Sequence, residues 1–462
     1  MAWENVDQLP LGKLLQIAFV DGVRTQVSIE HREFDMIKSK KVSAEAPREI
    51  RFGLQESILP NNVAYLSSTA SAFPSSFGLT FNEYIARMKT ISGTIGESIE
   101  LWQKAEKTPL RYAKPLLMQA DAIARSIRRN ISADVHGDGT GVIGTIASVS
   151  ATNINAAAPS GSFPYSVDVT LNVTDAAKGF IGFFEAGGLY KCYANTGGSA
   201  IVPTGGSNFA FFKCVRKNRA TNVVTLQLVA ADGITPVASY TTAIIAATNV
   251  FYRQAETIIP NLTSISDFAT VSGAFAGLES LAANDGRVVH GMTMNGVLAG
   301  SRFDAGDNVI DTSHLLAALD QGKLNVGGGV YKYKTMLCAP ETAAVFIDGR
   351  ETDRRFNAVA DNGRGSPGFT YTHYDDVLNV ETTEFTRKNR IWMSPEDSAG
   401  NKVIELHMCD LAPIRVGNQE EFMQPASGGG YSRSIFKAWE GYLTLLSRHP
   451  AAIISVHNFK LS

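Results

Sequence analysis

The chain has 462 residues, of which 44% are hydrophobic and 19% are charged. This length favours roughly two to four structural units, and the apolar fraction is high enough for buried cores, which excludes global disorder. Lys and Arg (42) nearly balance Asp and Glu (44), leaving a net charge of -2. The balance lacks the basic surplus of a dedicated nucleic-acid binder, so tight direct DNA binding is not indicated.

The four cysteines are scattered, without a C-x-x-C pair, which predicts free buried thiols in a reducing compartment. The first residues do not show a basic segment followed by an apolar one, and no run approaches the about 18 apolar residues of a membrane span. We therefore expect a chain that is made and used in soluble form, with no membrane partner.

Residues 1–47 are expected to form an extended arm with a short helix. They combine the proline-interrupted segment 9–12 with the charged segment 30–35 and a basic cluster at 38–41. Arms of this kind bury little against their own domain and become ordered on a neighbour. A partner chain is therefore predicted.

Residues 48–95 are predicted to form a long hairpin. Strand-like runs at 49–54 and 77–85 flank a stretch at 67–76 that is rich in turn formers. Because a two-stranded hairpin is marginally stable by itself in water, this hairpin also requires a neighbouring surface.

The strongest helix signal begins with Thr108 as N-cap and Pro109 at the first helical position. At 1.5 Å per residue, a helix from there to Val135 is about 40 Å long. Gly137 is expected to end it in the usual C′ role. Its apolar positions recur every three or four residues and form one stripe: Leu116, Ala120, Ile123, Ile127, Ile131 and Val135.

Residues 145–253 contain few charges and many Ala, Thr, Ser, Gly and Val residues. Strands are predicted at 166–173, 209–216 and 221–228, with one helix at 175–186 behind Thr174. The spacing of turns is typical of a small antiparallel sandwich or barrel, inserted between the helix and the rest of the chain.

After Pro260 the pattern is mixed α+β. Helices are predicted at 267–283, after the cap at Asp311, and from Pro340, with a strand at 331–338. The tail returns to strand-like alternation at 432–439 and 451–459.

The segment 139–144 matches G-x-G-x-x-G, but a dinucleotide site needs a strand before the turn and a helix after it. Here the helix comes first, so a tight chain reversal is favoured over a cofactor loop. Asp134, His136 and Asp138 flank the turn, and helix capping with turn chemistry is favoured over a metal site.

Other catalytic motifs are missing or out of context. The sequence contains no H-E-x-x-H, Walker A or G-x-S-x-G motif. An S-x-x-K match at 434–437 lies in the strand-like tail. We therefore assign no catalytic, cofactor-binding or metal-binding residue and expect a chain that is not an enzyme.

The order of arm, hairpin, long helix, β-rich insertion and α+β region resembles the major capsid proteins of tailed bacteriophages, which have the Hong Kong 97-type fold. The most specific piece is the helix that runs into the glycine turn, which looks like the end of that family's spine helix. The structural turn residues are Gly137, Asp138, Gly139 and Gly141.

The resemblance implies an α+β fold with six parts. They are an N-terminal arm (1–47), an E-loop hairpin (48–95), a peripheral domain with the spine helix (96–145), a β-rich insertion (146–256), an axial domain (257–420) and C-terminal strands that return to the peripheral domain (421–462).

The resemblance also assigns roles to side chains. The apolar face of the spine helix would contain Leu116, Ile123, Ile127 and Ile131. The E-loop would contact an adjacent subunit through Phe73, Phe77, Phe81 and Tyr84. Some members of the family crosslink E-loop lysines, but this chain has no Lys between Lys41 and Lys89, which disfavours that chemistry here.

The implied function is self-assembly into hexamers and pentamers of an icosahedral head shell around the viral genome, in a virion assembled in the host cytoplasm. The implied partners are further copies of the chain, scaffolding and portal proteins, a decoration protein, and packaged DNA through loose non-specific contact. Three alternatives stay open: an encapsulin-type shell that holds cargo enzymes, a nucleotide-dependent enzyme built on the glycine turn, and an adhesive β-protein.

Overall fold

The computed structural model describes most of the chain between residues 34 and 461. The described residues are 34, 36–42, 49–55, 81–98, 109–149, 166–174, 179–194, 209–230, 233–237, 247–253, 274–326, 331–348, 370–373, 376–397, 399–409, 412–413, 421–425 and 431–461.

A long antiparallel strand, β21 (Tyr431–Ser447), is the centre of the first sheet. β4 (Lys89–Ser98) pairs along one side of it. On the other side, β18 (Ile404–Cys409), β19 (Ala412–Pro413) and β20 (Glu421–Pro425) pair with successive parts of β21. β1 (Ile37–Val42) extends the sheet by pairing in parallel with β18.

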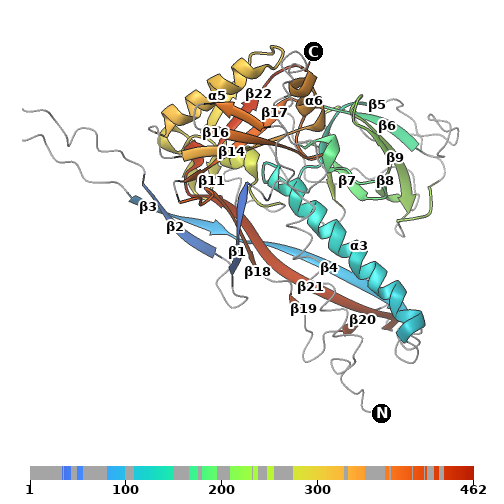
Figure 1. Ribbon diagram of the computed structural model, residues 1–462. Helices are drawn as coiled ribbons and strands as arrows, with labels where there is room; N and C mark the ends of the chain where they lie inside the picture. The colour runs from blue at the N-terminus through green and yellow to red at the C-terminus, as the bar shows by residue number, and fades with distance from the viewer. Residues whose placement is uncertain are drawn as a thin grey trace, which may run out of the picture.

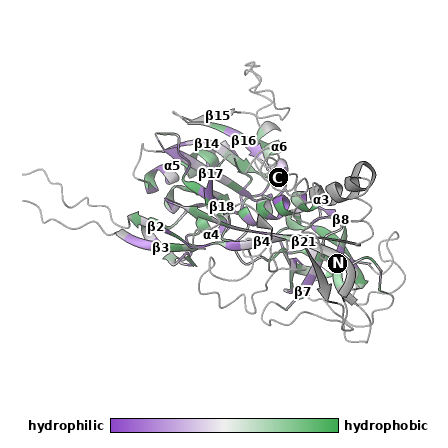
Figure 2. Cartoon of the chain, turned by 90° about the horizontal axis from the view of Figure 1, so that it is seen from below, coloured by the Kyte–Doolittle hydropathy of each residue, from purple (hydrophilic) through white to green (hydrophobic). Residues whose placement is uncertain are grey.

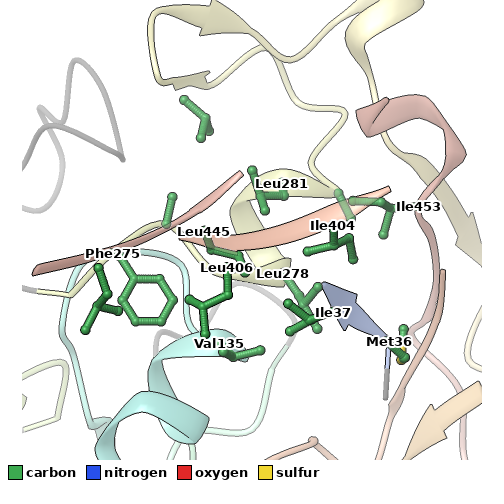
Figure 3. Packing of buried hydrophobic residues seen from close by; sticks show 14 of the residues in the cluster. Met36, Ile37, Val135, Phe275, Leu278, Leu281, Ile404, Leu406, Leu445 and Ile453 are labelled. Atoms are coloured by element: carbon green, nitrogen blue, oxygen red, sulfur yellow. The ribbon is translucent and has the colours of Figure 1, made fainter. Parts of the chain in front are cut away.

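The long helix α3 (Pro109–Val135) lies along this sheet and contacts β4 (Figure 1). The side chains on its inner face are buried, among them Ile127, Ile131 and Val135. They share a hydrophobic core with Trp439 and Leu443 of β21. The end of this core nearest Val135 also contains Phe275, Leu278, Leu406 and Leu445 (Figure 3).

A two-stranded hairpin formed by β2 (Glu49–Gln55) and β3 (Phe81–Arg87) projects from the body (Figure 1). Alternation along the strands gives it two different faces. Leu54 is buried, and Phe52 and Tyr84 are half-buried against the first core. Hydrophobic packing therefore holds the base of the hairpin to its own chain.

A closed antiparallel barrel is formed by six strands in the order β10-β5-β6-β9-β8-β7. Its apolar interior includes Val169, Phe184, Phe212, Leu226 and Phe251. The strands are β5 (Gly144–Val149), β6 (Ser166–Leu171), β7 (Leu189–Tyr193), β8 (Phe209–Asn218), β9 (Val223–Ala230) and β10 (Val250–Arg253).

A second six-stranded sheet has the order β13-β22-β17-β14-β16-β15 and packs with two helices. The strands are β13 (Ser301–Asp304), β22 (Ile454–His457), β17 (Arg390–Asp397), β14 (Tyr331–Cys338), β16 (Asp376–Thr382) and β15 (Thr370–His373). The helices are α5 (Thr312–Asn325) and α6 (Pro340–Asp348).

The remaining elements are short. They are α4 (Leu278–Leu281), the 3-10 turns η4 (Ile181–Phe183), η5 (Gly296–Leu298) and η7 (Pro450–Ala452), and the small β11–β12 pair (Val288–Val289 and Met292–Thr293). Figure 2 shows hydrophobic and hydrophilic stretches alternating along the strands and helices, with a hydrophilic stretch at β3.

Several elements with local start signals are confirmed. α3 begins at Pro109, β14 covers 331–338, and α6 begins at Pro340. The Asp311 side chain caps α5 by accepting a hydrogen bond from the His314 N–H at 3.0 Å. All four cysteines are buried and free.

The helix predicted at 175–186 is wrong for its described part, residues 179–186, where the structure has only the short turn η4. Phe180, Phe183 and Phe184 are buried in the barrel core. Their burial in this core overrides the local helical spacing, because helical propensity is weaker than tertiary packing.

The helix predicted at 267–283 is largely wrong in its described part. Residues 274–277 are not helical, and only the single turn α4 follows. Gly277 lies against the backbone of residues 134–137, which fixes the chain in an extended conformation there.

The tail differs from the prediction in two ways. β21 is one strand from Tyr431 to Ser447, longer than the predicted 432–439. The region 451–459 begins in η7 and contains only a four-residue strand, β22, which joins the second sheet and not the first. β18 and β19, from the end of the 257–420 segment, belong to the first sheet, so segments 257–420 and 421–462 both contribute to both sheets.

The expectation that residues 1–47 bury little against their own chain is wrong for 34–42. Phe34, Met36 and Ile37 are buried in the first core, and β1 is hydrogen-bonded to β18. The basic cluster at 38–41 lies in β1, and the remaining arm residues are outside the described ones.

A buried carboxylate fastens β1 to the sheet. The Glu405 side chain is 5% exposed and accepts contacts from Lys40 Nζ at 2.7 Å, His407 Nε2 at 3.0 Å and Arg448 Nε at 3.0 Å. Burial opposes its ionisation, but the hydrogen bonds from Lys40 and His407 and the charge of Arg448 hold the pKa of Glu405 below its ordinary value of 4.5. One carboxylate therefore links β1, β18 and the residue that follows β21.

We predict that Glu405→Gln lowers the free energy of unfolding at pH 7 by about 2 kcal/mol, because the buried side chain loses the charge of its hydrogen bonds with half-buried Lys40 and exposed Arg448. Since the folded-state pKa is depressed, the contribution is complete above pH 4.5 and is lost as the pH falls through the folded pKa. Urea titrations at pH 7 and pH 3 should show the difference between parent and variant shrinking. Glu83→Gln, at an exposed pair, should cost less than about 1 kcal/mol at both. An equal cost for the two variants would contradict the prediction.

Candidate functional site

The turn after α3 joins the helix, the barrel and the second half of the chain. α3 closes with the His136 N–H donating to Ala133 O at 3.2 Å and the Gly137 N–H donating to Asp134 O at 3.0 Å. These bonds span three residues, which is a 3-10 ending. The helix ends at Val135, before Gly137, and the left-handed residues of the turn are Gly139 (φ 81°) and Gly141 (φ 74°).

Close packing explains this ending. A Cβ on Gly277 would lie 2.3 Å from Asp134 O, 2.5 Å from Gly137 O and 2.6 Å from Val135 O. The backbone before α4 therefore touches the carboxyl end of α3 directly. Ser280 Oγ donates to Asp138 O at 2.7 Å, which fixes the turn to α4.

The polar residues of the turn have structural roles. The Asp138 carboxylate accepts from the Thr140 N–H at 3.1 Å and from the Thr140 hydroxyl. Asp134 forms an ion pair with Arg253 of β10 at 3.0 Å. These contacts are the capping and turn chemistry that the sequence favoured over a metal site.

His136 is buried, and burial lowers the pKa of its imidazole to about 3. Its ring stacks on Phe385 with centroids 6.4 Å apart, and Nδ1 lies 3.4 Å from the Thr386 hydroxyl. Among the described residues no group of three or more His, Cys, Asp or Glu side chains could hold a metal ion. His136 therefore acts as a neutral core residue.

A cavity of about 460 Å³ opens beside the turn, between α3, the barrel and the region around α4. Its ionisable lining includes four carboxylates and three guanidinium groups: Asp134, Asp138, Glu279, Asp285, Arg287, Arg302 and Arg387. Three of the acids are paired, since Asp134 binds Arg253 at 3.0 Å, Asp285 binds Arg287 at 2.6 Å and Glu279 binds Arg390 at 3.1 Å.

The electrostatics of this cavity oppose a dinucleotide cofactor. A phosphate site uses the positive amino end of a helix, but this cavity lies at the negative carboxyl end of α3. Carboxylates also contribute much of its wall. The glycine turn therefore has the wrong polarity for a pyrophosphate.

The loop between β16 and β17 fastens the barrel to the second sheet. Phe385 is 2% exposed and belongs to the barrel's own hydrophobic core. Next to it, Glu384 pairs with Arg129 of α3 at 2.5 Å and with Lys217 of β8 at 3.6 Å. The sequence analysis missed this joint, because a single Phe in a polar loop carries no local signal of its destination.

The predicted apolar face of α3 is placed as follows. Ile127 and Ile131 are buried in the first core, and Ile123 is half-buried against it. Leu116 lies within α3, but its side chain is outside the described ones.

The hairpin candidates fall in three positions. Phe73 and Phe77 are outside the described residues, and Phe81 is the first residue of β3, without a described side chain. Tyr84 is half-buried against its own chain, with its ring centroid 6.1 Å from that of Phe52.

The opposite face of the hairpin is exposed and was not singled out from the sequence. Ile85 is 37% exposed at its centre. Four charged side chains surround it as two loose ion pairs, Arg51 with Glu83 at 3.8 Å and Arg87 with Glu49 at 3.4 Å.

A scan of the sequence against known protein families finds no match, and a search of curated proteins also finds none. None of the helices in the described part of the chain is long and apolar enough to cross a membrane.

Solved structures with a similar arrangement are shell proteins. A chain of the cyanophage A-1(L) capsid has a TM-score of 0.43 and 8% identity, covering 93% of each chain. Gordonia phage Cozz gives 0.39 and 8%, covering 93% of this chain and 87% of that one. The encapsulin complex from Synechococcus elongatus gives 0.37 and 8%, covering 93% and 88%. A TM-score below 0.5 does not establish a shared fold, so the function proposed below rests on the residues of this chain.

We predict that Gly277→Ala destabilises the protein by about 3 kcal/mol or more, because the new methyl group would overlap three backbone carbonyl oxygens that cannot rotate away. Gly286→Ala is the matched control. Gly286 lies at a bend with φ 77°, and a Cβ there would meet nothing within 4 Å. Its cost should be the backbone strain of about 1 kcal/mol. Thermal unfolding of both variants tests the contact between Gly277 and the end of α3. Equal melting temperatures would refute it.

Proposed function

We propose that this chain is a shell-forming structural protein, the major capsid protein of a tailed bacteriophage, with the Hong Kong 97-type layout. In this proposal it assembles into hexamers and pentamers that close an icosahedral head around the genome. The protein carries out no chemical step and binds no cofactor.

The observation that carries the proposal is the extended layer formed by α3, β4 and β21 (Figure 1). At 1.5 Å per residue the 27-residue α3 is about 40 Å long. At about 3.3 Å per residue the 17-residue β21 is about 55 Å long. A helix and a sheet that run side by side over this length form a thin plate, which is a shape suited to tiling a surface.

The hairpin supports the same function. It projects beyond the plate as a two-stranded sheet, and its outer face presents Ile85 inside a frame of four charges. An exposed apolar residue with a polar rim is the composition of a small interface centre. We propose that this face, with Phe73, Phe77 and Phe81 further along the hairpin, lies against an adjacent subunit.

The proposed layout assigns the parts as follows. The arm is 1–47, the E-loop 48–95, the peripheral domain 96–145, the insertion 146–256, the axial domain 257–420 and the returning strands 421–462. The first sheet with α3 corresponds to the peripheral part, the barrel to the insertion, and the second sheet with α5 and α6 to the axial part. β18 and β19 cross from the axial range into the peripheral sheet, and β22 crosses in the other direction.

The near-neutral charge suits a shell whose lining contacts DNA loosely. We propose separate scaffolding and portal proteins and a decoration protein as partners, assembly in the host cytoplasm, and the virion as the final location. An encapsulin-type compartment would use the same plate and hairpin, and the contents of the assembled particle, DNA or cargo protein, distinguish the two.

We predict that Ile85→Asp reduces the shell fraction at least tenfold, because it places a carboxylate in a contact that excludes water. The subunit itself should keep its stability within about 0.5 kcal/mol, since the residue is exposed in the single chain. Light scattering and sedimentation measure the shells. Ile234→Asp, at a 71% exposed position on the barrel, is the control and should assemble normally. Normal assembly of Ile85→Asp would count against the hairpin contact.

A further inference from the structure

A second cavity, of about 230 Å³, lies where the barrel meets the end of the β16–β17 loop. The barrel supplies the turns after β6 and between β8 and β9, and the second sheet supplies the loop and a residue near the C-terminus. The lining residues are Asn172, Val173, Gly179, Phe180, Asn222, Arg387, Lys388, Asn389 and Phe459.

The polar part of this lining is made of hydrogen-bond donors. Arg387 and Lys388 are cationic, and three asparagines each carry an amide with two N–H groups. Among the described lining residues none is Asp or Glu. The first cavity differs, because four carboxylates line it.

Among the described residues around the cavity, positive charges outnumber negative ones. Arg129 and Lys217 share Glu384, while Arg219 and Lys388 share Glu341, at 2.8 and 3.9 Å. Four cations thus meet two carboxylates, in a chain whose net charge is -2. Burial lowers the pKa of Lys217, while the charge of Glu384 raises it and the charge of Arg129 lowers it.

Several of the lining groups are held in place without a ligand. Arg387 donates to the carbonyl oxygens of Gly179 at 3.0 Å and Thr174 at 3.4 Å. The Asn172 side-chain oxygen accepts from the Thr174 N–H at 3.0 Å. Asn222 has a left-handed backbone at φ 55°, which fixes the β8–β9 turn. A site whose donors are already ordered loses little conformational entropy on binding.

We infer that this cavity binds a phosphate-type oxyanion, either inorganic phosphate or the phosphate group of a nucleotide or nucleic acid. Its volume is several times the roughly 30 Å³ that one water occupies in the liquid, so a tetrahedral oxyanion fits with room for an attached group. Arg, Lys and amide N–H groups are the donors that bind phosphate oxygens in proteins. Phe180 and Phe459 supply apolar walls beside the donors.

The test is calorimetric titration of the full chain with three probes at constant ionic strength: inorganic phosphate, a nucleoside monophosphate and a short DNA duplex. Chloride at the same ionic strength is the reference. The variant Lys388→Gln removes one lining charge, and Lys332→Gln removes one exposed charge on β14, away from the cavity. Asn389→Asp adds a negative charge to the lining at nearly constant shape.

We expect saturable binding of inorganic phosphate, about tenfold weaker in Lys388→Gln and unchanged in Lys332→Gln, since a charge-assisted hydrogen bond to phosphate is lost in the first variant alone. Asn389→Asp should abolish binding, and Lys388→Arg should retain it. Tighter binding of the monophosphate or of the duplex identifies the source of the phosphate group. No binding beyond the chloride reference, or equal binding by the two Lys→Gln variants, would overturn the inference. The outcome is independent of whether the chain forms shells.

Discussion

The structure depends on how the last two turns of α3 are shared between two hydrophobic cores. Ile131 and Val135 are buried with the first sheet, and Ala133, between them, belongs to the barrel core. The helix end therefore cannot move relative to one core without losing contacts with the other. Because Gly277 has no Cβ, the backbone before α4 contacts the carbonyl oxygens of residues 134, 135 and 137. The region around α4 is therefore fixed at the same helix end.

The position of the barrel follows from this arrangement. Phe385 inserts into the barrel core, and Glu384 beside it pairs with both α3 and β8, so the barrel is held by burial and by charge at one loop. Both cavities lie along the line where the barrel meets the rest of the chain. One has a mixed lining with many carboxylates, at the negative end of α3, and the other is a donor-rich pocket with a positive surplus around it. The plate formed by α3, β4 and β21 extends away from this junction, and the hairpin projects on the opposite side (Figure 1).

Elements whose signals are local could be predicted from the sequence. Pro109 and the apolar spacing up to Val135 place α3, and Asp311 places the start of α5, because capping and periodicity act within one or two turns. The helix predicted at 175–186 failed because three phenylalanines there are buried by the barrel, and the arm prediction failed because β18 lies far along the chain from β1. The contact of Gly277 with the end of α3 was not predicted, because no local pattern connects residue 277 to the helix.

The candidate site could be predicted only in part from the sequence, for the same reason. The glycine turn and its reversed order relative to a cofactor loop could be recognised, and the negative surroundings agree with that interpretation. The joint at Phe385, the charged frame around Ile85 and the oxyanion cavity each combine segments separated by tens to hundreds of residues. A single sequence contains the residues but not their proximity.

Electron microscopy of the purified chain, alone and after co-expression with a scaffolding protein, tests the central claim most directly. The account predicts closed isometric shells built from rings of five and six subunits, with α3 and β21 lying in the plane of the shell wall. A chain that remains monomeric under both conditions, or that assembles with this plate perpendicular to the wall, would contradict it.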